Sequence, residues 1–296
     1  MDGAQAAFEV EWSDQGVREV LESITIPPCP AVVHVLLGQA RRPEVDVRLL
    51  AGTIGADVGI AAAVLQAANA PFFGMRGRAT TIAQALAVIG VRNLIKIVYG
   101  VMLGQGLGGG RAATLERFWD RSHYLPIAVA ALARRLSRID GDDAYTYGLF
   151  HDMGIAVLMQ EFIDYRATLA AANAAPGHFT RIEDERHRVN HAMVGAMFAR
   201  EWLLPPELCW AVFYHHHPQI FERPTEYATD AVLDLIALGR VAEHLVARFL
   251  GRPDDPEWAL SGVAMLARFG LDADGAEPLG DEVRPMLDEA RAYAAP

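Results

Sequence analysis

Apolar residues recur every three or four positions along almost the whole chain, which is the pattern of helices packed on one side. Residues 31–40 are typical, because Val33, Leu36 and Leu37 follow helical spacing just after a proline-rich segment that excludes a helix interior. No convincing run of alternating apolar and polar residues is flanked by hairpin turns. The pattern therefore predicts an all-α protein.

Short polar residues stand before the apolar segments of the first third of the chain, where their side chains can cap helix starts. A glycine is placed where it can end one of these helices. The predicted helices run from Asp46 through Ile54, from Asp57 to the residue before Asn69, from Thr80 or Thr81 to Gly90, and over residues 91–104.

The clearest break in composition is residues 105–110, where four glycines in six residues favour neither helix nor strand. We expect a boundary between two helical lobes there. Beyond it, the polar stretch 177–188 shows no helical apolar pattern. The helices expected around it include one containing Phe118 and Pro126, one beginning near Asp142, and further ones over about 189–202, 206–216, 229–250, 258–269 and 281–293.

Charge and composition disfavour several classes of partner. The net charge of -11 is repelled by phosphate backbones and anionic lipid surfaces, so we expect no nucleic acid and no membrane. The most apolar tract, Leu94–Gly104, is about half the roughly 20 residues of a membrane span and is expected to be a buried helix. Two cysteines do not make a disulfide framework, and no export signal is visible, so cytoplasmic localisation is expected.

DNA binding is the weakest of the functions considered. Residues 47–69 look like a helix-turn-helix, but Arg48 is the only basic residue between positions 45 and 75, and a recognition helix needs several. Val58, Ile60 and Val64 are expected to pack inside the N-terminal lobe instead.

Histidines are the main candidates for chemistry. Imidazole and carboxylate are ligands of divalent iron, manganese and zinc, and the helices of a bundle can bring them to one point. Each group taken alone has a structural reading as a hydrogen bond or a helix cap. Isolated histidines, namely His34, His178, His187 and His244, are expected to be surface or hydrogen-bonded residues. The candidate side chains fall into three compact groups: His151 with Asp152, His191, and His215 with His216 and His217.

Six short motifs follow one another between about residues 24 and 250. They are IPPCP at 26–30, QAANAPFFG at 66–74, IAQALAVIGVRNL at 82–94, YGLFHDMGI at 147–155, NHAMVG with WLLPP at 190–206, and YHHHP at 214–218. In this order they resemble the motifs of the HDOD family, the HD-related output domains of bacterial signalling proteins. The fourth is also similar to the GLLHDIG signature of the HD superfamily of metal-dependent phosphohydrolases.

The resemblance implies a two-lobed helical bundle with an HD-domain-like C-terminal lobe. The HDOD domain would cover residues 21–250, with an N-terminal helical lobe over 21–105 and the HD-like lobe over 111–250. An N-terminal extension over 1–20 and a C-terminal helical extension over 251–296 would flank it.

The resemblance also implies a metal site for iron, manganese, zinc or magnesium. In catalytic two-metal relatives, the HD-GYP phosphodiesterases that open cyclic di-GMP, two further ligands complete the site. Here the early histidine falls on Leu125, and His123 is displaced by roughly 200° on a helix. The final aspartate falls on Gly239. The positions that match the relatives' ligands are His151, Asp152, His191, His215 and His216.

These departures favour a non-catalytic regulatory or adaptor module with a degenerate metal site. The alternative is a metal-dependent phosphohydrolase or cyclic-dinucleotide phosphodiesterase, although residues 219–224 contain no GYP motif. The expected partner is a signalling protein. A small phosphorylated ligand, a cyclic dinucleotide and a second copy of the chain are further candidates.

Overall fold

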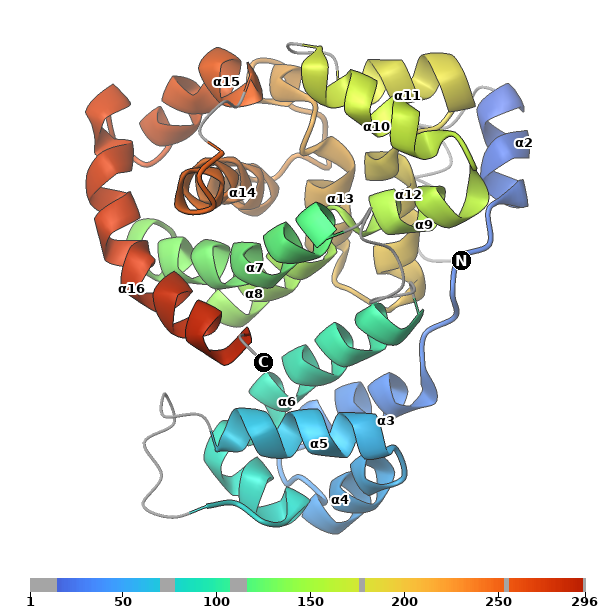
Figure 1. The fold of residues 1–296 in the computed structure, drawn as a ribbon, viewed down its shortest axis with the longest axis vertical. Coiled ribbons are helices and arrows are strands. Elements are labelled where there is room, and N and C mark those ends of the chain that lie inside the picture. Colours follow the sequence, from blue (N-terminus) through green and yellow to red (C-terminus); the bar gives the residue numbers. More distant parts are fainter. Residues whose placement is uncertain (1–14, 70–77, 107–115, 176–178, 253–255, 295–296) are drawn as a thin grey trace. The chain divides into compact units, whose positions relative to one another are not determined.

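The computed structural model describes residues 15–69, 78–106, 116–175, 179–252 and 256–294 (Figure 1). Throughout these residues the regular elements are α-helices and short 3₁₀-helices, which confirms the predicted all-α fold. The chain forms two compact units. One comprises Pro27–Ala113, and the other comprises Met1–Ile26 together with Thr114–Pro296.

The described residues of the smaller unit form four helices, α3 (Ala31–Ala40), α4 (Val47–Gly55), α5 (Val58–Ala68) and α6 (Ile82–Gly106). The predicted caps are present, because Asp46 accepts a bond from the Leu49 amide at 2.9 Å and Asp57 accepts one from Ile60 at 3.0 Å. Ile60 is buried as expected. Val58 is 82% exposed, so its predicted burial is wrong. Val58 is the first residue of α5, directly after the Asp57 cap, and its side chain points into solvent.

Helix α6 is bent at Gly90, where the sequence predicts a helix end. Gly90 has φ 72° and ψ 163°, a conformation that favours glycine. By length and composition Ile82–Leu103 could cross a membrane, a test that core helices of soluble proteins also pass. The bend divides it into pieces shorter than the roughly 20 residues of a span. Leu94 and Leu103 are buried, as predicted for this tract.

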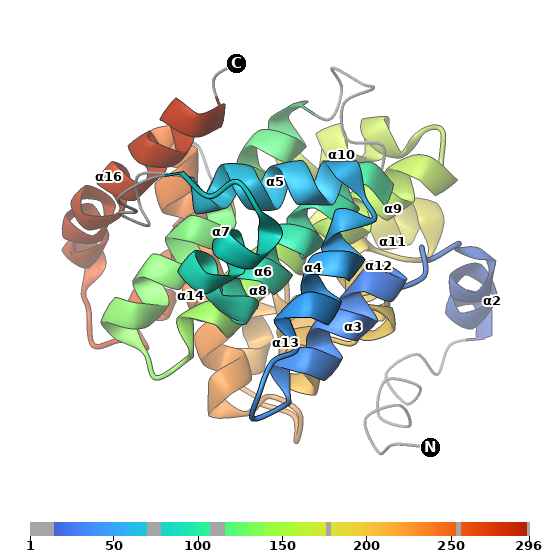
Figure 2. The same ribbon diagram turned by 90° about the horizontal axis from the view of Figure 1, so that it is seen from below.

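The larger unit packs its helices around α14, which is buried along most of its length. Helices α7, α13, α15 and α16 contact α14, and Figures 1 and 2 show α16 beside α7 and α14. Helix α7 runs through Pro126 without interruption, as expected. The helices of this unit are α2 (Gln15–Ser23), α7 (Glu116–Leu136), α8 (Gly141–Phe150), α9 (Met153–Glu161), α10 (Tyr165–Ala174), α11 (Phe179–His187), α12 (His191–Glu201), α13 (Pro206–Tyr214), α14 (Asp230–Phe249), α15 (Pro256–Ala267) and α16 (Ala276–Ala294).

Helix α11 lies in the stretch that the apolar pattern leaves outside the helices, so that interpretation is wrong. The side chains that α11 buries include Glu183 and His187, which are polar. Their partners are polar as well, since Tyr165 donates to Glu183 and Thr168 lies 2.9 Å from the His187 ring. A helix whose buried face is hydrogen-bonded has no apolar period to detect.

Candidate metal centre

The His-Asp pair lies at the junction of two helices. His151 is the C-cap of α8, and Asp152 is the N-cap of α9. On one continuous helix, adjacent side chains would point about 100° apart. The break at this junction instead brings the two side chains together, with His151 Nε2 3.4 Å from Asp152 Oδ2.

Two glycines bring α9 against α12. A Cβ on Gly154 would collide with the carbonyl oxygen of His191 and lie 2.7 Å from the Gly195 nitrogen. Asn190 caps α12 by accepting a bond from the Met193 amide at 2.9 Å, which fixes His191 at the first turn. The glycines of the HDMG and HAMVG segments therefore allow α9 and α12 to approach closely. This close approach places Asp152 beside His191.

Four of the five residues predicted as metal ligands converge. One ligand atom from each lies within 4.8 Å of the others. His191 Nε2 and His215 Nε2 lie 3.6 Å and 3.5 Å from Asp152 Oδ1, and 3.3 Å from each other. The four residues are Asp152, His191, His215 and His216.

In each of the three histidines, Nδ1 already has a hydrogen-bond acceptor. Such an acceptor keeps the proton on Nδ1 and leaves Nε2 with a free lone pair, which is the arrangement common around protein metal ions. The bonds join His191 to Glu183 Oε2 at 2.7 Å, His215 to the Val212 carbonyl at 2.6 Å, and His216 to Glu257 Oε1 at 2.9 Å.

Burial keeps the rings of His215 and His216 neutral. It lowers the pKa of His215 to about 3, with the neighbouring His191 adding to the effect. Burial also lowers the pKa of His216 well below its ordinary value, with His215 contributing. Phe179 covers the cluster, with its ring stacked on His216 at 5.1 Å.

The four-residue cluster fits a divalent cation. With Nδ1–H of each ring donating to its acceptor, the Nε2 lone pairs face one another and a carboxylate, and lone pairs repel unless a cation lies between them. Within the described residues, Asp152 Oδ1 is buried and accepts no hydrogen bond, whereas Oδ2 meets the Arg121 guanidinium. Three imidazoles and one carboxylate are a donor set suited to zinc, iron or manganese, whereas magnesium prefers oxygen ligands.

A second group, formed by His151, Asp152 and Glu243, has a cation from the chain itself. The Arg121 guanidinium on α7 contacts Asp152 Oδ2 and lies 3.6 Å from Glu243 Oε1. Arg240 pairs with the other Glu243 oxygen at 2.9 Å. Burial would raise the pKa of Glu243, but Arg240, His151 and Arg121 together hold that pKa well below its ordinary value. These charges are balanced without a metal ion.

His151 belongs to this second group rather than to the four-residue cluster. Its Nδ1 lies 3.1 Å from the Gly148 carbonyl, and its Nε2 lies 3.3 Å from Glu243 Oε1. Burial lowers the pKa of His151 to about 4, partly opposed by the Glu243 hydrogen bond.

The two ligand positions that the sequence lacks are filled by bulky side chains. Leu125 is fully buried, while His123 is exposed with its ring against Tyr124. A Cβ on Gly239 would lie 2.8 Å from the Tyr147 ring, so Tyr147 occupies the space of a side chain there.

Sequence reasoning missed the charged residues that surround the histidines. Arg121 stands four residues before Leu125, and Glu243 stands four residues after Gly239. Each charged residue therefore lies one helical turn from a position where this chain lacks the expected ligand, and on the same face of the helix. A charged residue at that spacing was the available signal. The missed residues are Arg121, Glu183, Arg240, Glu243 and Glu257.

The isolated histidines behave largely as expected. His34 is exposed, and His187 is hydrogen-bonded to Thr168. His244 stacks on Trp258 with ring centroids 4.0 Å apart. His178 lies outside the described residues.

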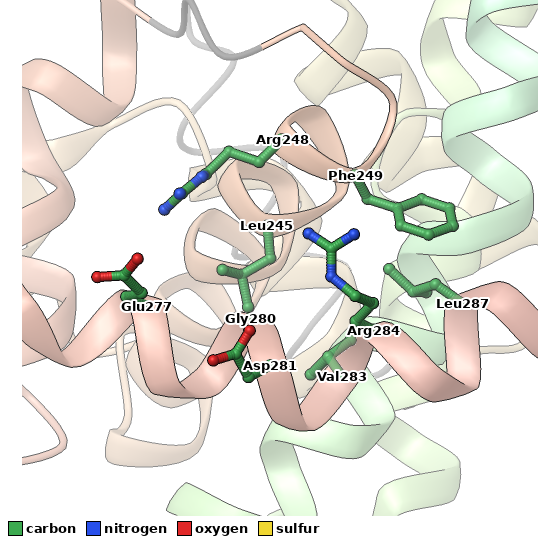
Figure 3. Close-up of a pocket in the computed structure, with 9 residues that line it drawn as sticks. All are labelled: Leu245, Arg248, Phe249, Glu277, Gly280, Asp281, Val283, Arg284 and Leu287. Atoms are coloured by element: carbon green, nitrogen blue, oxygen red, sulfur yellow. The ribbon is translucent and has the colours of Figure 1, made fainter.

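A surface pocket between α14 and α16 shares no lining residue with the histidine cluster (Figure 3). Leu245, Phe249 and Leu287 contribute apolar surface to it. Arginines and acidic residues both lie around it, so its charge selects no class of ligand.

An all-α fold with clustered histidines and an aspartate from separate helices defines an HD-type protein. The HDOD domain family matches residues 26–218, and the chain therefore belongs to the HDOD family. This confirms the resemblance seen in the motifs.

One relative of this chain is found by sequence. An uncharacterized protein of Treponema pallidum (strain Nichols) is 26% identical over 212 residues, which are 68% of this chain and 39% of that protein. The chain thus spans well under half of that relative's length.

Among solved structures, an HDOD domain protein of unknown function from Geobacter sulfurreducens has a TM-score of 0.68 at 20% identity, covering 94% of this chain and 96% of that one. A candidate signal transduction protein from Marinobacter aquaeolei VT8 has a TM-score of 0.69 at 20% identity, covering 99% and 66%. At such identity these likenesses show the fold alone.

Proposed function

We propose that this protein is a bacterial signal-transduction module of the HDOD family that acts without catalysis. It retains one metal position of an HD site and fills the neighbouring position with an arginine. The observation that carries the proposal is the contact of the Arg121 guanidinium with the Asp152 carboxylate.

Two-metal hydrolysis of a phosphodiester needs two cations about 3.5–4 Å apart, which activate water and hold the phosphate oxygens. A guanidinium balances charge but does not lower the pKa of water as a bound metal does. Arg121 already balances the charge of Asp152, and Leu125 and Gly239 supply no ligand side chain, so a second metal would find an incomplete set of ligands and no unbalanced carboxylate.

The first position would be held by Asp152, His191, His215 and His216. Four protein ligands would leave a four-coordinate ion no open position for water or substrate, which is typical of structural rather than catalytic zinc. A metal there would stabilise the junction of α8, α9, α12 and α13, and its chemistry would be charge neutralisation.

The proposed partner is another signalling protein, and the proposed location is the cytoplasm. A small phosphorylated ligand or a cyclic dinucleotide remains a candidate regulator of the module, and a homodimer is a candidate assembly.

A metal-dependent phosphohydrolase is the second candidate, favoured by the assembled His-Asp cluster. Metal titration of the purified protein with Mn²⁺, followed by assays with cyclic dinucleotides and generic phosphodiesters, separates the two. The adaptor proposal predicts no metal-dependent hydrolysis. Turnover that is lost in His151→Ala would overturn it.

A further inference from the structure

Glu257 lies beyond the residues matched by the HDOD family, yet it contacts a candidate metal ligand. It belongs to α15, and its Oε1 lies 2.9 Å from His216 Nδ1. Its other oxygen, Oε2, lies 2.7 Å from Arg240 NH2. The side chains of His216 and Arg240 are only 5% and 8% exposed, and that of Glu257 is 19% exposed. Solvent therefore screens these contacts weakly.

The contacts of His216 Nδ1 decide which ring nitrogen carries the proton. Arg240 NH2 lies 3.4 Å from the same Nδ1, but a guanidinium only donates, so that bond would require an unprotonated Nδ1. The shorter contact is to a carboxylate, which only accepts. Nδ1–H therefore donates to Glu257, and Nε2 is left free for a metal.

Helix α15 is held near its start by these contacts and by one aromatic stack, and near its end by the buried side chains of Met265 and Leu266. Trp258 stacks on His244 of α14 with an interplanar angle of 8°. Farther along the helix, Leu260 and Val263 are 68% and 61% exposed. Because the apolar anchors lie toward the end of the helix, the polar contacts of Glu257 matter most for the docking of its first turn.

We propose that Glu257 is a positioning residue for His216 and that it couples the docking of α15 to metal binding. The coupling rests on the metal site proposed above. A metal on Nε2 makes Nδ1–H a stronger donor to Glu257, and a docked Glu257 holds the ring ready for the metal. The coupling is reciprocal, because each event must favour the other by the same factor.

Cobalt binding tests the positioning role directly. Co²⁺ titrations followed by visible absorption would compare the wild type with Glu257→Ala, Glu257→Gln and the control Glu282→Ala, whose carboxylate pairs with Arg135 on an exposed surface. We expect Glu257→Ala to weaken Co²⁺ binding about 10- to 100-fold and Glu257→Gln to recover part of it, since the amide oxygen still accepts. Unchanged affinity in Glu257→Ala would overturn the proposal.

Amide hydrogen exchange of α15 tests the coupling. We expect Co²⁺ to slow exchange in α15 of the wild type and to have no such effect in Glu257→Ala. Equal slowing in both proteins, or none in a wild type that binds Co²⁺, would contradict the coupling.

A measurement without metal separates this inference from the metal site. In chelator-treated protein, the ¹⁵N shifts of the His216 ring report its tautomer. We expect Nδ1–H in the wild type and a shift toward Nε2–H in Glu257→Ala. The same tautomer in both proteins would overturn the positioning role. If the tautomer differs between them but the wild type binds no Co²⁺, only the proposed metal site and the coupling built on it would be overturned.

Discussion

The guanidinium of Arg121 lies against the carboxylate of Asp152, the aspartate of the His-Asp pair. The arginine comes from α7, one turn before the position where catalytic relatives are expected to carry a histidine ligand. The positive charge of Arg121 balances the carboxylate of Asp152, which is only 2% exposed. Without this arginine, the buried carboxylate would need a second cation to balance it. The chain thereby supplies internally the positive charge of a second metal, but not its ability to activate water.

Replacing Arg121 should destabilise the metal-free protein and favour metal uptake. Arg121→Ala leaves Asp152 and Glu243 close together without this cation, so we expect a loss of about 1–3 kcal/mol in the free energy of unfolding. This loss is smaller than that expected for a fully buried ion pair, because the Arg121 side chain is 36% exposed and solvent screens its charge. The affinity for Mn²⁺ should rise. Urea unfolding with a chelator and calorimetric titration measure the two effects. Arg135→Ala, at an exposed pair, should change stability by less than about 0.5 kcal/mol.

The Gly154 contact predicts a strong effect from one methyl group. In Gly154→Ala the added Cβ meets the backbone of α12, which cannot move without displacing His191. We expect a loss of at least about 3 kcal/mol, or failure to fold. Gly52→Ala is the matched control, since nothing lies within 4 Å of its Cβ position in α4, and it should gain about 0.5–1 kcal/mol. Equal unfolding midpoints in the two variants would refute the packing argument.

Acid should destabilise the metal-free protein before carboxylates titrate. Burial lowers the pKa of His151 to about 4 and that of His215 to about 3, while the unfolded chain protonates both near 6.5. Between these values the unfolded state binds more protons, so stability falls as pH falls from about 6.5 to 4. The slope should approach about 1.4 kcal/mol per pH unit for each histidine. Urea unfolding with a chelator at pH 7, 6 and 5 measures it, and a flat profile would contradict buried neutral rings.

Restoring the absent aspartate should fail sterically. Gly239→Asp forces a side chain into the space of the Tyr147 ring, and we expect a loss of about 1–3 kcal/mol. Tyr147→Ala should relieve part of that loss when the two changes are combined, although it leaves a cavity by itself. A double-mutant cycle of unfolding free energies gives the coupling. Strict additivity would show that the two residues do not compete for this space.

The sequence predicted most of the fold because most helices bury an apolar face. It missed α11, whose buried Glu183 and His187 carry no apolar signal, and it gave no boundaries for α9 and α10. The motifs located the histidines because the HD signature is local in sequence. They did not locate Arg121, Glu243 or Glu257, whose roles depend on contacts between helices distant in sequence, such as α7 with α14.

The number of metal ions bound per chain, measured together with phosphodiester hydrolysis, tests the central claim most directly. Purified wild-type protein saturated with Mn²⁺ or Co²⁺ and freed of excess metal should hold one equivalent and show no hydrolysis of cyclic dinucleotides. Two equivalents with hydrolysis that depends on His151 would contradict an arginine-filled, non-catalytic site.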